Sequence, residues 1–421
     1  MVDDFRQPSK PGNKEVAKNE PDFIPPEDVA GQEDLSNVIS QKSNAENNTI
    51  VNPSKKLKTV VEPFIVLKHW VVGRSKKQKI MLGLGMGVLV GLLVVGGLLI
   101  FNKPKPAPVA PVVVKKEEIK EPPKPTTEPS KLTGIQIPIE LNLLPVTAIM
   151  IENSPDARPQ SGLKEAGVVF EAVAEGGITR FLTLFQEAQP DYVGPVRSVR
   201  PYYLKWLQGF DAAVAHVGGS GEALEMIATE GIKDLDQSYN SGSFQRIRQR
   251  YAPHNVYTSL GALRALEKEK GWTSSNFTGF TRKVENAPPA PTVNTIDFAI
   301  SGPLYNAHYD YVPATNTYNR SQAGQPHIDE RSGVQLSPKV VIALVMPKGI
   351  HPDGIHTTYE TIGSGAAYFF QDGGVTEGTW SKASHKEQFI FKNPSGTTVG
   401  LNPGQTWISI VGAAPNVSYR L

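Results

Sequence analysis

The longest apolar run in the chain spans residues 80–101 and contains no charged side chain. About 20 consecutive apolar residues in a helix are enough to cross a hydrocarbon layer of roughly 30 Å. Because a backbone in lipid must satisfy its own hydrogen bonds, this run is expected to be helical despite its glycines. A buried helix of a soluble protein is the alternative, but such a helix is rarely apolar on every face. The pattern therefore predicts a single transmembrane helix.

Basic residues flank the apolar run unevenly. The dense basic group RSKKQK precedes it, whereas Lys103 and Lys105 follow it among prolines. The flank richer in cations usually stays in the cytoplasm. We therefore expect a single-pass protein of the cell membrane, with a cytoplasmic N-terminus and its C-terminal domains outside the cytoplasm.

Three glycines repeat at four-residue spacing within the run: Gly83, Gly87 and Gly91. Small residues at this spacing fall on one helix face and let two helix backbones approach closely. They indicate a possible homodimer through the membrane helix, with the ordinary glycine enrichment of membrane helices as the alternative.

The pattern changes several times on either side of this helix. The beginning of the chain is polar and lacks apolar periodicity, and the segment after the helix is rich in proline and lysine, which favours an extended spacer. The expected organisation is a disordered cytoplasmic tail (1–60), a juxtamembrane segment (61–79), the transmembrane helix (80–101), a Pro/Lys-rich stalk (102–138), an α/β domain (139–272), a connector (273–293) and a β-rich domain (294–421).

Strand and helix patterns alternate in the first of the two external regions. The runs PVTAIMIE, AGVVFEAVAE, ITRFLTLFQE and FDAAVAHVGG read as strands, and RPYYLKWLQG, SGEALEMIATEG and SLGALRALEKEKG read as helices. This interleaving favours an α/β domain. Short alternating runs with turn signals follow, including KVVIALVM and QTWISIV, and predict a mainly antiparallel β domain.

Composition narrows the possible chemistry. The net charge of +2 gives no overall preference for polyanions, and nucleic-acid binding is not expected of a domain outside the cytoplasm. The absence of cysteine excludes disulfides, thiolate metal sites, cysteine nucleophiles and a lipidated N-terminal cysteine. The chain contains no P-loop, nucleophile elbow, HExxH or dinucleotide motif, so no cofactor is identified.

Candidate site residues instead lie in local clusters. Arg158 follows the first strand in NSPDARPQSG, and ligands of α/β sheets bind at such strand ends. Arg197 and Arg200 precede a proline-initiated helix, where two guanidinium groups beside free N–H groups suit an anion. His216 ends a strand before a Gly-Gly-Ser-Gly turn containing Ser220, which would let a ligand approach the backbone.

Other clusters offer catalytic candidates. Glu171 and Glu175 lie before the strand that carries Arg180, and either carboxylate is a candidate general base or cation ligand; a plain Glu–Arg pair at a hairpin is the alternative. His254 is a third catalytic candidate. The remaining candidate ligand-binding residues are Asn255, which follows His254, and the His-x-Asp pair His327 and Asp329, whose two side chains are too few to define a metal site.

At these clusters the sequence resembles the YerB-like family of bacterial cell-envelope lipoproteins, a family with paired N- and C-terminal domains of unknown function. The resemblance rests on NSPDARPQSGL, AGVVFEAVAEGGITRFLTLF, VGPVRSVRPYYL, HVGGS, APHNVYT, GQPHID and LNPGQTWI, in the family's order. It implies a place in the cell envelope. Family members commonly carry a lipidated cysteine, for which the apolar helix would substitute here.

The layout also resembles that of LytR–CpsA–Psr phosphotransferases, with an anchor, an external α/β domain and several arginines. No motif matches closely, so this is an analogy of layout. It would give Arg158, Arg180, Arg197 and Arg200, with Glu171, roles in holding a pyrophosphate.

Three functions follow from these observations. The leading hypothesis is an envelope protein that binds an anionic or glycan ligand, such as a cell-wall polymer, in a cleft lined by arginine and histidine. The alternatives are an enzyme acting on a phosphate-linked or glycosidic substrate and a protein-interaction scaffold for wall assembly. The first two predict that Arg158, Arg180, Arg197, Arg200 and His254 converge on one pocket with a carboxylate.

Overall fold

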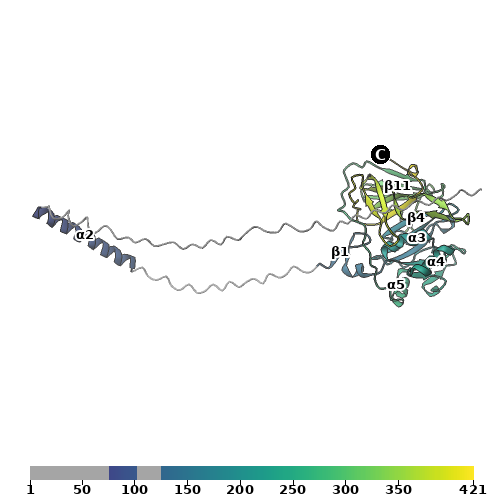
Figure 1. Ribbon diagram of the computed structural model, residues 1–421, viewed down its shortest axis with the longest axis horizontal. Coiled ribbons are helices and arrows are strands. Elements are labelled where there is room, and N and C mark those ends of the chain that lie inside the picture. The colour runs from purple at the N-terminus through teal and green to yellow at the C-terminus, as the bar shows by residue number, and fades with distance from the viewer. Residues whose placement is uncertain (1–74, 102–124) are drawn as a thin grey trace, which may run out of the picture. The chain divides into compact units, whose positions relative to one another are not determined.

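The computed structural model describes residues 75–101 and 125–421. The expected tail, most of the juxtamembrane segment and most of the stalk lie outside these residues. The described chain consists of one long helix, α2, and a compact unit that carries all the remaining elements (Figure 1).

Helix α2 (Lys76–Phe101) contains the predicted apolar run and begins four residues before it. By length and composition it could cross a membrane. It is a candidate span, and its lysines lie at its start, with no basic residue in its last turn.

A ten-stranded sheet forms the centre of the compact unit. Strand β5 is antiparallel to both β4 and β3, so these two run parallel to one another, and β14, β20, β6 and β7 share their direction. In order across the sheet the strands are β19 (Ile390–Lys392), β18 (Gly374–Lys382), β17 (Gly363–Gln371), β14 (Val340–Val345), β20 (Thr406–Val411), β4 (Val168–Glu175), β5 (Ile178–Phe185), β3 (Thr147–Glu152), β6 (Ala213–His216) and β7 (Asp234–Asp236).

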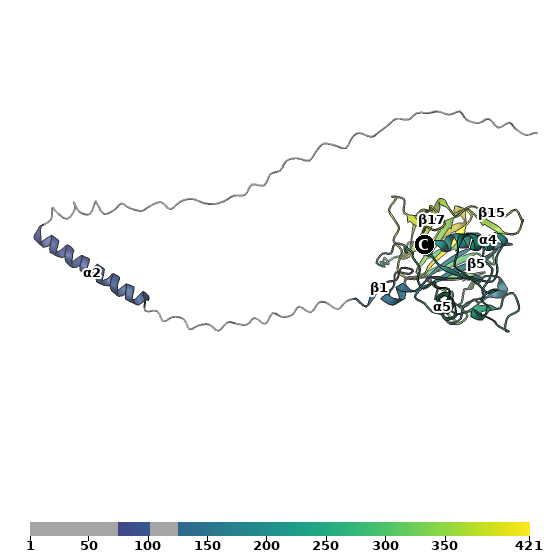
Figure 2. The same ribbon diagram turned by 60° about the horizontal axis from the view of Figure 1, so that its bottom comes forward.

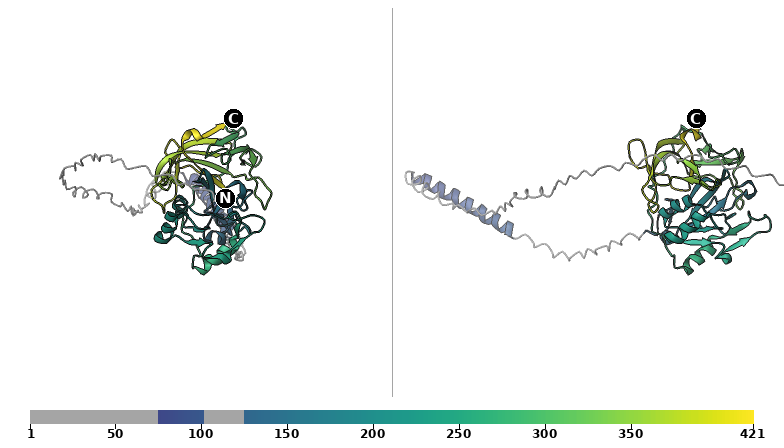
Figure 3. Two further views of the ribbon diagram at one scale, coloured as in Figure 1. Left: turned by 90° about the vertical axis from the view of Figure 1, so that its right-hand side faces the viewer. Right: turned by 45° about the vertical axis from the view of Figure 1, so that its right-hand side comes forward.

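The sheet takes strands from both external regions. Strands β4 and β20, which are far apart in sequence, pair directly and in parallel. In Figure 3 the earlier strands, in blue and teal, and the later strands, in green and yellow, lie within this one unit. The two regions expected from the sequence are therefore joined by main-chain hydrogen bonds along the middle of one sheet.

Each face of the sheet buries its own hydrophobic core. One core contains side chains of α3 (Pro201–Leu207) and α4 (Gly221–Glu230), with Trp206 and Phe170 stacked 5.7 Å apart. The other core contains side chains of α5 (Leu260–Glu269) and of a second, five-stranded sheet. That sheet has the order β13 (Gln325–Pro326), β12 (Thr317–Gln322), β11 (Ala307–Val312), β10 (Thr295–Phe298) and β21 (Val417–Arg420).

Short elements complete the unit. Single-turn helices occur at Ile139–Leu143, Pro155–Ala157, Gln208–Phe210, Ser241–Ser243 and Ala414–Asn416. Three two-stranded ribbons pair β1 (Thr127–Pro129) with β2 (Gln136–Pro138), β8 (Phe244–Arg246) with β9 (Val256–Thr258), and β15 (Lys348–Ile350) with β16 (Thr357–Tyr359).

Two boundaries differ in detail from the sequence pattern. Residues 127–138, expected at the end of the stalk, form the β1–β2 ribbon, and Leu132 within it is buried in the first core. Residues 273–293, where the sequence predicts a connector, form no helix or strand, and Phe280 within them is buried in that core as well. A single apolar residue among prolines and lysines carries too little pattern to reveal such burial.

Candidate functional site

The carboxyl ends of seven strands lie along one edge of the main sheet. Strands β3, β4 and β6 end at this edge with Glu152, Glu175 and His216. The edge of parallel strands where carboxyl ends gather is the usual place for ligands in α/β sheets. Polar side chains concentrate there in two groups, and a third group lies between the two sheets; each group has its own partners.

The first group is the Glu152 cluster, which we define as Glu152, Ser154, Arg197 and His254. The buried carboxylate of Glu152 accepts hydrogen bonds from Nδ1 of His254 at 2.9 Å and from Oγ of Ser154 at 3.1 Å. It also lies 3.2 Å from Nε of Arg197, close enough for an ion pair but without the geometry of a hydrogen bond. Because a carboxylate only accepts, Nδ1 of His254 carries a proton, and in the neutral ring Nε2 is left with a lone pair.

The Glu152 cluster reaches the surface through its two basic members. The side chains of Arg197 and His254 are 27% and 21% exposed, whereas that of Glu152 is 4% exposed. Within residues 125–421, Nε2 of His254 and the η nitrogens of Arg197 form no hydrogen bond or ion pair. His254 lines a hollow of about 670 Å³ together with Arg250. The carboxylate thus orients His254 and forms an ion pair with Arg197, and the outer nitrogens of both basic groups remain available.

The second group consists of Glu175, Arg180 and Arg200. Arg180 and Arg200 both bind the carboxylate of Glu175, the latter with Nη2 at 2.7 Å. Burial opposes ionisation of this carboxylate, but the two arginines hold the pKa of Glu175 below its usual value. The Glu–Arg pairing considered as an alternative for this hairpin is therefore present, with a second arginine added.

Arg200 also lines a cleft beside this group, between the first turn of α4 and the β15–β16 ribbon. Figure 2 shows β15 beside α4. Across the cleft, His351 lies 4.0 Å from Glu222, and its Nδ1 lies 3.0 Å from the carboxylate of Asp353. Acidic and basic side chains both line this cleft, so it has no clear preference for an anion.

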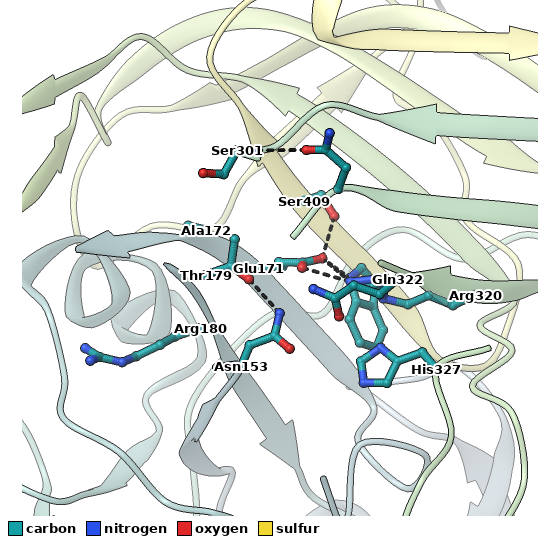
Figure 4. Close-up of polar contacts among 12 residues, drawn as sticks. Asn153, Glu171, Ala172, Thr179, Arg180, Ser301, Arg320, Gln322, His327 and Ser409 are labelled. Carbon is teal, nitrogen blue, oxygen red and sulfur yellow. Dashed lines mark hydrogen bonds and ion pairs between the residues drawn. The ribbon is translucent and has the colours of Figure 1, made fainter. Parts of the chain in front are cut away.

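The third group lies between the two sheets and is centred on Glu171. Glu171 and Arg320 are fully buried, and Nη2 of Arg320 contacts both carboxylate oxygens at 2.8 and 2.9 Å (Figure 4). Trp407 and Ser409 donate to the same carboxylate. Although burial opposes its charge, the pKa of Arg320 is raised by Glu171. The carboxylate of Glu171 is saturated and has no route to solvent.

Glu171 and Glu175 therefore do not face each other across a cleft. Glu171 lies in the sheet-to-sheet interior, while Glu175 binds the arginines of the second group. A register shift in β4 between Val173 and Glu175 separates them. The paired-acid geometry that glycoside hydrolysis requires is not formed by these two residues.

Arg158 and His327 line a further hollow of about 360 Å³ at the border of the third group, which we call the Arg158 hollow. Arg158 donates to Asn153 through Nε at 3.1 Å and to the carbonyl of Leu304 through Nη2 at 2.8 Å. Its guanidinium lies 5.3 Å from the centre of the Tyr305 ring. His327 is held by Oε1 of Gln160 at 2.9 Å from its Nε2.

The other predicted residues have local partners. His216 is buried and bonds the carbonyl of Gly218 and Asp234, and Ser220 caps α4 by accepting from the amide of Ala223. Asn255 accepts from Arg246 and donates to the carbonyl of Ile247. Asp329 is fully buried and accepts from the amides of Gly162 and Ser332.

The structure thus divides the expected cluster of four arginines and His254. Arg197 and His254 share Glu152, whereas Arg180 and Arg200 share Glu175. Arg158 binds neutral partners at a separate hollow. The prediction that all five converge on one pocket is wrong, because the strand ends direct these side chains into different surroundings.

Two central residues were absent from the sequence-based set. Glu152 is the last residue of the first predicted strand, and a charged residue at the end of an apolar strand indicates a candidate site residue. Arg320 had no such signal. Arg320 lies with the buried Tyr318 and Gln322 on the inner face of β12. Arginine is rarely buried without a partner, and the sequence alone does not reveal the partner.

Comparison with known proteins identifies the family. Residues 132–273 match the family described as "Protein of unknown function (DUF3048) N-terminal domain", and residues 296–408 match the corresponding C-terminal domain. "Putative lipoprotein YerB" of Bacillus subtilis (strain 168) is 31% identical over 286 residues, covering 66% of this chain and 85% of that protein.

A solved structure agrees with this match. The crystal structure of the YerB protein from Bacillus subtilis superposes with a TM-score of 0.64 and 28% sequence identity, covering 69% of this chain and 99% of that one. The compact unit therefore has a YerB-like fold with a mostly β-rich C-terminal region. The resemblance predicted from the sequence motifs is confirmed: the chain belongs to the YerB-like family, whose two DUF3048 domains have no known function.

Proposed function

We propose that this chain is a membrane-anchored envelope protein whose external unit binds an anionic or glycan envelope polymer through the Glu152 cluster. The observation that carries the proposal is the shared carboxylate, because Glu152 holds both Arg197 and His254 with their outer nitrogens free. A guanidinium fork suits the planar or branched oxygens of a carboxylate or phosphate. The imidazole can add one hydrogen bond to the same group.

The position of the cluster supports this role. It lies at the carboxyl edge of the sheet, next to a hollow large enough to admit a segment of a polymer. Its basic groups are held in place before a ligand arrives, so little side-chain freedom is lost on binding. The net charge of the cluster is small because Glu152 offsets Arg197. We therefore expect modest affinity with a moderate salt dependence.

Anchoring by α2 is part of the proposal. The helix is long enough to span a bilayer, and the basic residues before it favour a cytoplasmic N-terminus. Because the chain has no cysteine, single cysteines can report this topology. In intact cells, Ser395→Cys should react with an impermeant maleimide and Ser9→Cys should react only after lysis. The reverse labelling would contradict the orientation.

Binding can be tested with the full chain in detergent micelles and purified anionic wall polymers. Sedimentation with the polymer should fall several-fold between about 50 and 500 mM salt. Arg197→Ala combined with His254→Ala should remove most of the binding. Arg420→Ala provides the matched control, since Arg420 is 74% exposed and distant in sequence. Binding that is insensitive to salt, or equal loss in the control, would contradict the proposal.

One observation favours an enzyme as the second candidate. In the Glu152 cluster the carboxylate fixes the tautomer of His254 and leaves the Nε2 lone pair open, which is the arrangement of a general base. Nε2 would take a proton from a water molecule that attacks the phosphorus or anomeric carbon of a substrate bound by Arg197; the bond to the leaving oxygen would break, and that oxygen would receive the proton from the imidazolium. Release of product from the polymer by the wild-type chain, abolished in His254→Gln with binding retained, would support this candidate.

A homodimer through α2 is also proposed from the Gly83, Gly87 and Gly91 repeat. Its contacts would lie within the membrane and would not involve the Glu152 cluster. Dimer formation and polymer binding can therefore be measured separately.

A further inference from the structure

We infer that the Arg158 hollow is a binding site for a sugar acid, a hydroxyl-bearing ring that carries a carboxylate. This site differs from the Glu152 cluster and does not rest on the function proposed above. It lies at the border between the two sheets, where β12 and the following loop face the loop after β3. Three of its lining side chains determine the chemistry: Arg158, Gln322 and His327.

His327 contributes a bare hydrogen-bond acceptor. The amide nitrogen of Gln160 donates to the carbonyl of Glu152 and to Asn153, so its Oε1 is the atom that faces His327. Nε2 of His327 must therefore carry the proton. Burial, together with Arg320 and Arg158, holds the pKa of His327 well below its usual value, so the ring is neutral. Its Nδ1 has a lone pair and no partner among the described residues.

Gln322 contributes a second bare acceptor. Its Nε2 donates to the carbonyl of Leu304 at 3.5 Å, which directs Oε1 away from that carbonyl. Oε1 is buried and lacks a partner within the described part of the chain. Figure 4 shows the side chains of Gln322, His327 and Asn153 turned toward the same space beside the Glu171–Arg320 pair. Both Gln322 and His327 are only 5% exposed.

Arg158 contributes a positive charge without a carboxylate partner. Its hydrogen bonds go to Asn153 and to main-chain carbonyls, and Nη1 forms none within residues 125–421. No aspartate or glutamate lines the hollow, whose other walls include Pro159, Pro326 and Ile328. Partial burial of the guanidinium lowers the pKa of Arg158.

These groups specify a complementary ligand. Unpartnered buried acceptors favour a molecule that donates hydrogen bonds, and hydroxyl groups donate. The single cation favours a carboxylate, which can accept a charge-assisted hydrogen bond from the free Nη1 of Arg158. Proline and isoleucine walls suit the C–H faces of a saturated ring. A ring with hydroxyl groups and one carboxylate satisfies all three requirements, whereas a neutral sugar or a simple fatty acid satisfies only part of them.

The experiment measures binding to the full chain in detergent micelles by calorimetry, with glucuronate as the probe. Glucose tests the need for the carboxylate, and acetate tests the need for the hydroxyl groups. Glucuronate should bind at least ten-fold more tightly than either. The inference would be overturned if glucuronate did not bind, as expected of a hollow that holds only water. Equal binding of acetate and glucuronate would overturn it as well.

Two variants separate ligand binding from a structural role. Gln322→Leu removes a buried acceptor that has no partner, so its melting temperature should equal or exceed that of the wild type, while glucuronate binding falls at least ten-fold. Arg158→Gln should reduce the preference for glucuronate over glucose to less than two-fold. Unchanged glucuronate binding in Gln322→Leu would overturn the site. Loss of binding in Arg197→Ala alone would instead place the ligand at the Glu152 cluster and overturn it as well.

Discussion

Replacing Glu171 by glutamine tests whether this carboxylate holds the two sheets together. The change keeps the size of the side chain but leaves the charge of Arg320 uncompensated in a fully buried position. Removing one partner of a buried ion pair costs about 3–5 kcal/mol. A folded domain has a total stability of roughly 5–15 kcal/mol, so this loss would be a large fraction of it.

The partners of Glu171 explain why the cost is high. Arg320 donates to both carboxylate oxygens, and Trp407 and Ser409 donate to one of them. Glutamine would offer one carbonyl oxygen and place an NH₂ group against the guanidinium. Arg320 would keep its contacts with aromatic rings, including Trp407 at 4.6 Å, but these replace only part of the lost interaction.

The assay is urea unfolding of the full chain in detergent micelles, followed by tryptophan fluorescence. Glu285→Gln is the control, because its ion pair with Lys339 is partly exposed and should be worth at most about 1 kcal/mol. Combining Glu171→Met with Arg320→Met should recover most of the stability, since an apolar replacement of a whole buried pair is often neutral. A loss in Glu171→Gln no larger than in the control would refute the reasoning.

Three further predictions concern pH and assembly. Burial lowers the pKa of Lys382 to about 8, so above that pH the unfolded chain binds more protons than the folded chain. The stability of the wild type relative to Lys382→Met should therefore rise between about pH 8 and 10.5, by up to about 3 kcal/mol, and urea unfolding across this range measures the rise. The pKa of Glu175 is lowered in the folded state, so its contribution to the free energy of unfolding is present above about pH 4.3 and is lost as the pH falls through the folded-state pKa. Glu175→Gln should therefore lower the free energy of unfolding by about 2 kcal/mol at pH 7 and by progressively less in acid, and an equally large difference from the wild type at pH 3 would contradict this. Gly87→Leu should abolish chemical cross-linking of a dimer in micelles, whereas Leu89→Ala should leave it intact.

The elements with continuous apolar runs were predictable from the sequence. Strands β3 and β4 and the helices α3 to α5 lie within the runs that indicated them, because their buried faces carry uninterrupted hydrophobic residues. Strand β18 was missed, since most of its residues are partly exposed and polar. The run TTVGLN at residues 397–402 also predicts a strand, but these residues form only isolated bridges.

The sequence indicated where polar side chains would gather, but not which of these side chains would bind one another. The motifs after the strands place polar residues at the carboxyl edge, because a chain reversal there must carry polar residues. Which arginine meets which acid depends on the direction of each strand end and on the connection that crosses it. Arg197 and Arg200 are three residues apart, yet one binds Glu152 and the other Glu175.

Burial of polar residues between the sheets was the least predictable feature. Arg320, Gln322 and His327 lie in a polar part of the sequence that reads as solvent-exposed strand and turn. Their burial depends on Glu171 and Gln160, which lie roughly 150 residues earlier in the chain. A local pattern contains no information about such distant partners.

The nitrogen resonances of His254 test the central claim most directly. The full chain with ¹⁵N-labelled histidine contains eight histidines, and His254→Gln identifies the resonances of His254 by their absence. The free protein should show the tautomer protonated at Nδ1, as the bond to Glu152 requires, and an anionic wall polymer should shift the Nε2 resonance. Polymer binding that leaves both His254 nitrogens unchanged, or a tautomer protonated at Nε2, would contradict the account.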